Sequence, residues 1–482
     1  MPDTLTAPPA PSPIDTAKQS IAAVAHPLRW IVLAVVMAAN MMDLMDATIV
    51  NVAGPSIQSA LGGSDSALQW LSAGYTLAFA VFLITGARLG DMFGRRRLFL
   101  IGSAGFTLMS AACALAPSTT VLIAFRMAQG AFGALLIPQG FGIIKEVFAE
   151  DEMGKVFGAF GPVMGLSMLA APILAGVLVG VHLFDGWRLV FLINVPVGIV
   201  TFALALRTLP RTIAHPGIKL DKVGMVLIGI ALTAIVYPLI EGREDGWPAW
   251  TFRSLAGGAA VLGAFLLWER HSRGDALIEP SLLSNRTYVS GILVALATFG
   301  AFGGLLLCVS LFTQLGEGFS AIHAGLTLTP MVIGMVAGMT ASFALVKRLG
   351  RNLIQIGVSL IAVGAAILAL TVTGSHSVST WDLAPALAII GLGAGASFGQ
   401  LFDFILAGVT MEEVGSASGV LEAVQQLSSA IGVAALGTIF FSAFGDGLPT
   451  HALAITAWAC LVPLAAAFIL VFRLPMQARE EQ

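Results

Sequence analysis

The chain repeats one pattern from end to end: stretches of roughly twenty apolar residues, separated by short polar segments with Lys and Arg at alternate ends. A helix needs about twenty apolar residues to cross a hydrocarbon core of about 30 Å. A segment surrounded by lipid must satisfy its own backbone hydrogen bonds, so each stretch is predicted to be helical. The predicted helices are 29–56, 66–88, 97–116, 120–144, 154–181, 187–206, 222–240, 250–268, 287–313, 323–346, 352–373, 382–408, 416–442 and 453–473.

Composition agrees with this pattern. Hydrophobic residues make up 57% of the chain and charged residues only 11%, whereas soluble domains carry about 25% charge. We therefore expect an all-α, polytopic membrane protein with fourteen transmembrane helices. Neither a nucleotide-binding loop nor a soluble insertion of domain size is present, so ATP is not the expected energy source. The three cysteines lie inside predicted helices and are expected to be buried apolar residues, not disulfide partners.

The positive charges predict the orientation, because cytoplasmic loops carry an excess of Lys and Arg. With the N-terminus in the cytoplasm, most Lys and Arg fall on the inner side, and the outer loops hold only Arg188, Arg243 and Arg253. An even number of spans returns the C-terminus to the same side. We expect a multi-pass protein of the cytoplasmic membrane with two cytoplasmic tails. The first tail, 1–26, is rich in Pro, Ala, Ser and Thr and is expected to be disordered; the second is 475–482.

Two predicted inner loops resemble each other at a constant offset. The matched residues are Leu89, Gly94 and Arg95 in the first loop, against Leu345, Gly350 and Arg351 in the second. Two six-helix bundles, 27–207 and 286–474, with two inserted helices in 208–285, would produce this spacing. Repeated halves around a site near the membrane midplane are a common plan for transporters.

The first of these loops carries a motif. GARLGDMFGRRR at 86–97 resembles the loop motif G-x-L-x-D-x-x-G-R-K of the Major Facilitator Superfamily. The matching residues are Leu89, Asp91, Gly94, Arg95 and Arg96. Gly94 permits a tight turn, and we expect Asp91 and the arginines to form charge-assisted bonds across a domain interface that switches conformation. Simple anchoring by positive charge explains the arginines, but not the placed Asp and Gly.

Further motifs resemble the 14-helix drug:proton antiporter branch of this family. MDATIVNVAGPSI at 45–57 resembles its first-helix signature, and LIAFRMAQGAFGA at 122–134 resembles the fourth-helix motif R-x-x-Q-G. APILAG at 171–176 is similar to the fifth-helix antiporter motif G-P-x-x-G-G. Pro172 and Gly176 keep that pattern, whereas alanines replace two glycines, and small residues there allow close helix packing.

The resemblance covers essentially the whole chain, since 187–198 and 408–432 also look like this branch. It implies the major facilitator fold and proton-driven export of a drug-like or toxic organic compound. One departure is Gln425, which stands where the family often has Arg.

Charges at membrane depth are functional candidates, because each costs about 2.5–3.5 kcal/mol on insertion scales. Asp43 and Asp46 are three residues apart and share one helix face. Counted from the inner surface at about 1.5 Å per residue, they lie about 21 and 26 Å deep, and Arg126 lies about 28 Å deep. We expect Arg126 to face the carboxylates and the three residues to couple transport to protons. A static ion pair between the first and fourth helices is the alternative.

A second polar set lies in the C-terminal half. Asp403 and Glu422 lie about 13 Å deep by the same helical rise. With Gln425, and with Gln129 of the fourth helix, they are candidates for a substrate cavity that attracts a cation. Polar residues in a wet vestibule are the alternative reading. Two other acids, Glu241 and Glu269, sit at helix ends and are expected to be solvated.

The sequence therefore predicts a proton-coupled antiporter for multidrug or antibiotic efflux, working by alternating access. It is not expected to be an enzyme, and no catalytic residues or metal site are expected. No cofactor is expected either, because the proton gradient supplies the energy for transport. The expected partners are a small hydrophobic or cationic substrate, protons and membrane lipid, with no nucleic acid, and the chain is expected to be a monomer.

Three alternatives stay open. One is a dedicated exporter of a single metabolite, such as the host's own antibiotic. Another is an importer of the same fold. A non-transporting membrane sensor is the third, although it would not need the intramembrane residues Asp43, Asp46 and Arg126.

Overall fold

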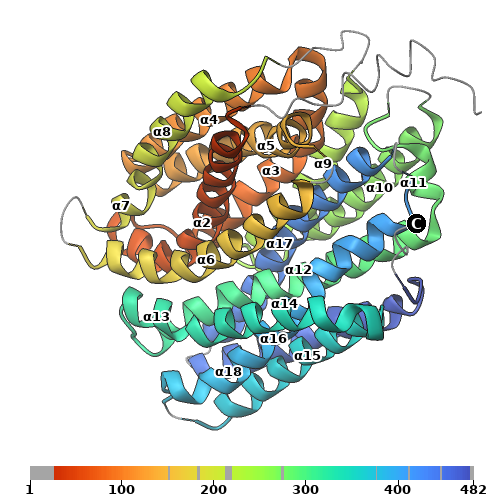
Figure 1. Ribbon diagram of the computed structural model, residues 1–482. Helices are drawn as coiled ribbons and strands as arrows, with labels where there is room; N and C mark the ends of the chain where they lie inside the picture. Colours follow the sequence, from red (N-terminus) through yellow and green to blue (C-terminus); the bar gives the residue numbers. More distant parts are fainter. Residues whose placement is uncertain are drawn as a thin grey trace, which may run out of the picture.

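The computed structural model describes residues 27–149, 152–181, 185–211, 220–272, 276–375, 377–410, 413–445 and 448–477. The predicted disordered tail, 1–26, lies outside these residues, as does most of the predicted C-terminal tail. The described chain is helical throughout, without a β-strand. Its helices form two bundles, one above the other in Figure 1.

The first bundle corresponds to the first six predicted spans. Its helices are α2 (Arg29–Leu61), α3 (Asp65–Phe93), α4 (Arg95–Ala114), α5 (Thr119–Val147), α6 (Met153–Val179), α7 (Trp187–Leu192) and α8 (Asn194–Thr208). The sixth predicted span is thus broken into α7 and α8 at Ile193.

The inserted pair consists of α9 (Lys222–Glu241) and α10 (Ala249–His271). A short helix that the hydropathy pattern does not predict, α11 (Pro280–Ser284), follows them. The second bundle then contains α12 (Arg286–Leu311), the π-helical turn η2 (Phe312–Gly316), α13 (Ala321–Thr327), α14 (Thr329–Leu349), α15 (Asn352–Val372), α16 (Thr380–Ala407), α17 (Val414–Phe444) and α18 (Pro449–Val471).

Among the described residues, thirteen helical segments are long and apolar enough to cross a membrane, with α7–α8, α12–η2 and α13–α14 each counted as one. The remaining predicted span, 154–181, is occupied by α6, which contains the shorter apolar stretch Ala170–Val179. The predicted all-α, polytopic fold is therefore confirmed. The three cysteines are buried and free, as expected.

The helices have two kinds of end. We call the end at which α2 begins the basic end, because the arginines of the 86–97 loop lie there, and the other end the opposite end. At the basic end the two related loops adopt related turns: Gly94 has a φ of 91° and Gly350 a φ of 53°, values that favour glycine. In each bundle an arginine next to this turn donates to a carbonyl oxygen at the end of the last helix, Arg96 to Leu206 and Arg351 to Phe472. The residue matched to Arg351 in the sequence is Arg95, which instead pairs with Asp91 and Glu146.

The two bundles are held together toward the opposite end. Gln69, near the start of α3, donates to the carbonyl oxygens of Val433 and Ala434 in α17, at 3.3 and 3.1 Å. Ser310 of α12 donates to the carbonyl oxygen of Asn51 in α2, at 2.8 Å. One buried hydrophobic cluster continues from the first bundle into the second across the same region. These contacts close the molecule on that side.

Two acids that were expected to be solvated are packed into the fold. Glu241 accepts a hydrogen bond from Trp70 Nε1 at 2.6 Å, which ties the inserted pair to α3. Glu269 is 0% exposed and accepts from the backbone amide of Ile278 at 2.9 Å. The expectation that Glu269 is solvated was wrong, because two segments lie against its carboxylate. One is the segment after α10, which contains Ile278. The other is the first turn of α9, where Gly224 has no side chain.

The loop between α9 and α10 makes further contacts with α3. Arg243 forms an ion pair with Asp65 at 2.9 Å, and Glu244 accepts from the backbone amide of Ser66 at 2.9 Å. Partial burial alone would raise the pKa of Glu244, but the hydrogen bonds from Ser66 and Ser64, together with the charge of Arg243, lower that pKa below its ordinary value. The carboxylate is therefore charged at neutral pH, and this contact is lost only in acid.

Candidate functional site: a buried acid–base network

The centre of the first bundle holds an acid and a base that are both 0% exposed: Asp46 on α2 and Arg126 on α5. Arg126 Nη1 donates to Asp46 Oδ2, and Nε donates to the carbonyl oxygen of Leu71 at 3.2 Å. The depths estimated from the sequence therefore identified a pair that is in direct contact.

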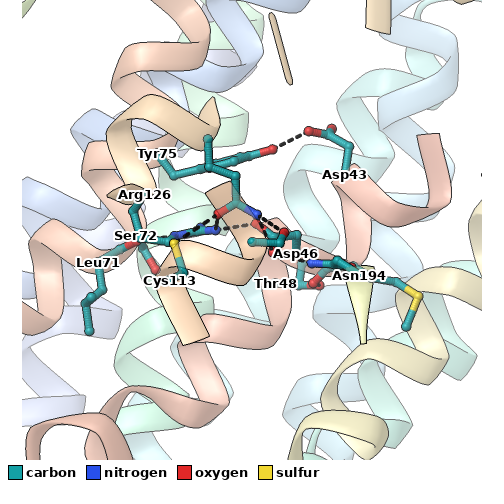
Figure 2. A network of polar contacts seen from close by, with 12 residues as sticks. Asp43, Asp46, Thr48, Leu71, Ser72, Tyr75, Cys113, Arg126 and Asn194 are labelled. Atoms are coloured by element: carbon teal, nitrogen blue, oxygen red, sulfur yellow. Dashed lines mark hydrogen bonds and ion pairs between the residues drawn. The ribbon is translucent and has the colours of Figure 1, made fainter. Parts of the chain in front are cut away.

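Other donors complete the surroundings of Asp46. Its second oxygen, Oδ1, accepts from Gln129 Nε2 at 3.1 Å and from Asn194 Nδ2 at 2.6 Å. Figure 2 shows Asn194 and Arg126 approaching Asp46 from different helices. A carboxylate can only accept hydrogen bonds, and all three neighbouring groups donate. Every described hydrogen bond at Asp46 is therefore accepted by its carboxyl oxygens.

Gln129 lies inside this network instead of on an exposed cavity wall. Its side chain is 0% exposed. Its oxygen accepts from Arg126 Nη1 at 2.8 Å, while its amide nitrogen donates to Asp46 and to Ser110 Oγ of α4, at 3.1 and 2.7 Å. An amide can bridge the two charged partners because it both donates and accepts. Gln129 thus bridges Arg126 and Asp46 in the described arrangement, and its role as a substrate-cavity residue stays a prediction.

The guanidinium group of Arg126 has further contacts beside Asp46, but one of its nitrogen atoms lacks a hydrogen-bond partner in the described structure. Its guanidinium carbon lies 4.2 Å from the centroid of the Tyr75 ring and 5.9 Å from that of Phe191, so the two rings contribute cation–π attraction. Its Nη2 atom is buried without a hydrogen-bond partner in the described structure. Burying two charges is costly even when they pair. A site with this cost and one unused donor is a candidate for a functional role.

Asp43 has a different partner from the one expected. It lies one turn from Asp46 and is 8% exposed, but it accepts its hydrogen bond from the hydroxyl group of Tyr75. Arg126 thus makes its described ion pair with Asp46 alone. Figure 2 shows the Asp43–Tyr75 contact to one side of the Asp46 network. The two carboxyl groups therefore sit in separate environments that the Tyr75 side chain connects.

Two residues of this site were not singled out in the sequence. Asn194 follows the break between α7 and α8, within a segment that was noted only for its family resemblance. Tyr75 is fully buried in α3. A polar Asn in a membrane span and a buried Tyr hydroxyl both require hydrogen-bond partners, and that requirement was the available signal.

The candidates of the second bundle lie on two helices. Asp403, on α16, is exposed, whereas Glu422 and Gln425, on α17, are partly exposed. Next to Glu422, Ala423 packs into a buried cluster made otherwise of first-bundle residues, among them Tyr75. The Glu422 carboxyl group also lies within electrostatic range of Asp43. This stretch of α17 therefore brings an acid of the second bundle toward the site of the first.

The loop motif makes its described contacts within the first bundle. Asp91 and Arg95 form an ion pair at 3.0 Å, and Arg95 also pairs with Glu146 at 3.2 Å. Leu89 is partly buried. The expected bonds across the domain interface are not among these contacts. In the described arrangement the two bundles are joined toward the opposite end. The motif lies at the basic end, where Asp91 and Arg95 make their ion pairs with residues of the first bundle.

The fifth-helix motif lies where α6 meets the second bundle. A Cβ atom on Gly176 would overlap the backbone of Ile322 in α13. A Cβ atom on Gly325, also in α13, would overlap the carbonyl oxygen of Pro172. The small residues therefore allow two backbones from different bundles to touch, which is the close packing expected of the motif.

Comparison with known proteins identifies the family. A family model described as Major Facilitator Superfamily matches residues 36–433. The chain belongs to the Major Facilitator Superfamily. The resemblance read from the 86–97 loop is therefore confirmed.

Two relatives within the superfamily are similar to this chain over most of their length. A Streptomyces coelicolor protein named "Probable actinorhodin transporter" is 45% identical over 458 residues, which cover 92% of this chain and 79% of the relative. A Streptomyces alboniger protein named "Puromycin resistance protein pur8" is 36% identical over 431 residues, which cover 88% and 84%.

A solved structure supports the fold. The auto-inhibited form of a POT family peptide transporter aligns with a TM-score of 0.69 at 14% sequence identity, over 94% of this chain and 98% of the other. At this identity the likeness concerns the fold alone.

Proposed function

We propose that this chain is a transporter, not an enzyme, and that it exports a drug-like or antibiotic compound in exchange for protons. The observation that carries the proposal is the buried Asp46–Arg126 pair with its surrounding donors. An acid and a base at the centre of a membrane bundle cost stability, and such residues commonly mark proton pathways. The relatives named for actinorhodin transport and puromycin resistance support export of an antibiotic-like molecule.

A second candidate is narrower: a dedicated exporter of one antibiotic. It is favoured by the names of the same two relatives, because each name gives a single compound. Both candidates share one mechanism and differ only in the breadth of the substrate site.

The proposed orientation places the basic end in the cytoplasm, because the excess of Lys and Arg lies there. The contacts of Gln69 and Ser310 would then close the outer side, and the described arrangement would face inward. One chain contains the whole acid–base network, so a monomer suffices for the mechanism.

Proton coupling is proposed to run through Asp46. When the outer side is open, its carboxylate takes up a proton from outside, and the ion pair with Arg126 is lost. When the basic end opens, the proton leaves to the cytoplasm, and the pair forms again. A driving force of about 150 mV is worth about 3.5 kcal/mol for each proton. That energy supports a substrate gradient of roughly a few hundred-fold.

Substrate recognition is proposed to lie beside this network, at Asp43 and Glu422. These carboxyl groups come from different bundles and lie within electrostatic range of one another. A cationic substrate between them would relieve their repulsion. Motion of the bundles would then change the distance between the two acids, and with it the affinity for the cation.

The conformational change is proposed to break the contacts toward the opposite end. These include the packing of Gly176 against Ile322 and the bond from Trp70 to Glu241. As these contacts open, the basic ends of the bundles would approach each other, and Asp91 of the loop motif would exchange partners. Each step breaks polar contacts on one side and forms them on the other, so the states can be close in energy.

Proton release in proteoliposomes tests the proposal. Purified protein is reconstituted with a pH-sensitive dye in the lumen, and puromycin, actinorhodin and unrelated cations are added in turn. We expect a lumenal pH change that requires both the protein and a transported compound. Compound movement without any accompanying proton movement would contradict the coupling. A response to one compound alone would favour the dedicated exporter.

A further inference from the structure

A cavity of about 760 Å³ opens at the basic end, where the inserted pair meets the second bundle. Three arginines line it: Arg270 from the last turn of α10, Arg286 from the first turn of α12 and Arg473 just after α18. They come from three separate segments, so the tertiary fold brings the charges together. The rest of the described lining is Leu283, Ser284, Val289 and Ser290.

The three guanidinium groups lack a counter-charge within the described chain. The cavity lining includes no acid there, and none of the three forms an ion pair with a described residue. Two other arginines at the same end are paired: Arg29 with Glu152, and Arg95 with Asp91. The cavity thus gathers three arginines, from three segments, that form no ion pair with a described residue.

Such a cluster is suited to a phosphate group. Each guanidinium carries five N–H donors in a planar fork that matches phosphate oxygens. Like charges that converge on one cavity repel each other, and a bound anion removes that repulsion. The hydroxyl group of Ser290 in the lining adds a neutral donor of the kind that also binds phosphate or glycerol oxygens, whereas the hydroxyl group of Ser284 donates to the carbonyl oxygen of Pro280 at 3.2 Å.

An apolar path leads away from the arginines along α12. Val289, which lines the cavity, is 36% exposed, and Leu293, one turn further along, is 41% exposed. Residues four apart lie on the same helix face. Their exposed side chains therefore continue from the charged cavity toward the middle of the membrane-spanning helix, as lipid chains would.

We propose that this cavity binds the headgroup of an anionic phospholipid, with the phosphate on Arg270, Arg286 and Arg473 and an acyl chain along Val289 and Leu293. Basic cavities between membrane helices are suited to such headgroups. The site lies apart from the Asp46 network, and the proposal does not depend on which compound is exported. Bound lipid would brace the contact between the inserted pair and the second bundle.

The test compares two variants that lose the same charge. The cavity variant carries Arg270→Gln, Arg286→Gln and Arg473→Gln. The matched control carries Arg97→Gln, Lys347→Gln and Arg348→Gln, which are exposed at the same end but outside the cavity. Full-length protein in neutral detergent is titrated with phosphatidylglycerol, phosphatidylcholine or inorganic phosphate. Bound lipid is counted by native mass spectrometry, and the melting temperature is recorded.

We expect wild type and control to bind phosphatidylglycerol in preference to phosphatidylcholine. The cavity variant should bind it about 100-fold more weakly, since each basic residue near a lipid surface contributes about 1 kcal/mol and 1.4 kcal/mol is tenfold. Each single substitution should weaken binding in part, so the proposal is testable even if the triple variant does not fold. Equal losses in both triple variants would overturn it. Equal stabilisation by inorganic phosphate would overturn the assignment to a lipid.

Discussion

Removal of the buried base should cost far more stability than removal of a surface base. Arg126→Gln leaves the Asp46 carboxylate buried, with only the amides of Gln129 and Asn194 as donors. Loss of one partner from a buried pair typically costs about 3–5 kcal/mol. The matched control is Arg95→Gln, because Arg95 is 31% exposed in its pair with Asp91. Pairs of that kind contribute about 0–1 kcal/mol.

A double-mutant cycle separates the pair from its surroundings. Asp46→Asn alone removes the charge that balances Arg126 and places an amide nitrogen among groups that already donate. Combining it with Arg126→Gln removes both charges. The double variant should therefore lose less stability than the sum of the losses in the two single variants. We expect a coupling energy of about 1–3 kcal/mol, within the range for residues in contact.

The assay is reversible unfolding in mixed micelles, followed by tryptophan fluorescence. Wild type, the two single variants, the double variant and the Arg95→Gln control are unfolded under identical conditions. Two results would show that Asp46 and Arg126 do not act as a buried pair. One is a loss of unfolding free energy in Arg126→Gln no larger than that in the Arg95→Gln control. The other is a coupling energy near zero in the cycle.

Three further predictions concern topology and conformational exchange. A cysteine introduced at position 117 should be labelled from outside the cell, and one at position 217 only after permeabilisation; the reverse pattern would contradict the proposed orientation. Asp91→Asn should greatly reduce transport while expression and substrate binding are retained, and lost binding with normal cycling would exclude a switching role. Gly176→Val places a side chain against the backbone of Ile322, so the accessibility of cysteines introduced on the proposed outer side should rise by severalfold. The control is Gly257→Val, because a Cβ atom there meets no neighbour. This control should leave cysteine accessibility unchanged.

Much of the fold was readable from the sequence because lipid imposes a simple rule on each span. The rule says nothing about breaks inside an apolar stretch. Thus the interruptions at Ile193 and Leu328 were missed, since neither changes the hydrophobic pattern. The short helix Pro280–Ser284 was missed because it does not cross the membrane.

The candidate site was predictable in depth but not in direction. Counting residues from the membrane surface placed Asp43, Asp46 and Arg126 at similar levels. However, residues three apart on a helix differ by about 60° around its axis. That rotation turns Asp43 toward Tyr75, while Asp46 meets Arg126. A depth estimate contains no information about this angle.

The central claim is that Asp46 carries the coupled proton, and uphill export by Asp46→Asn tests it most directly. Wild type and variant are reconstituted at matched density, a pH gradient is imposed, and substrate accumulation against its own gradient is measured. The account predicts that wild type accumulates substrate, whereas Asp46→Asn shows none of this uphill transport and retains at most exchange down a gradient. Uphill accumulation by Asp46→Asn at the wild-type level would contradict the account and show that the proton is carried elsewhere.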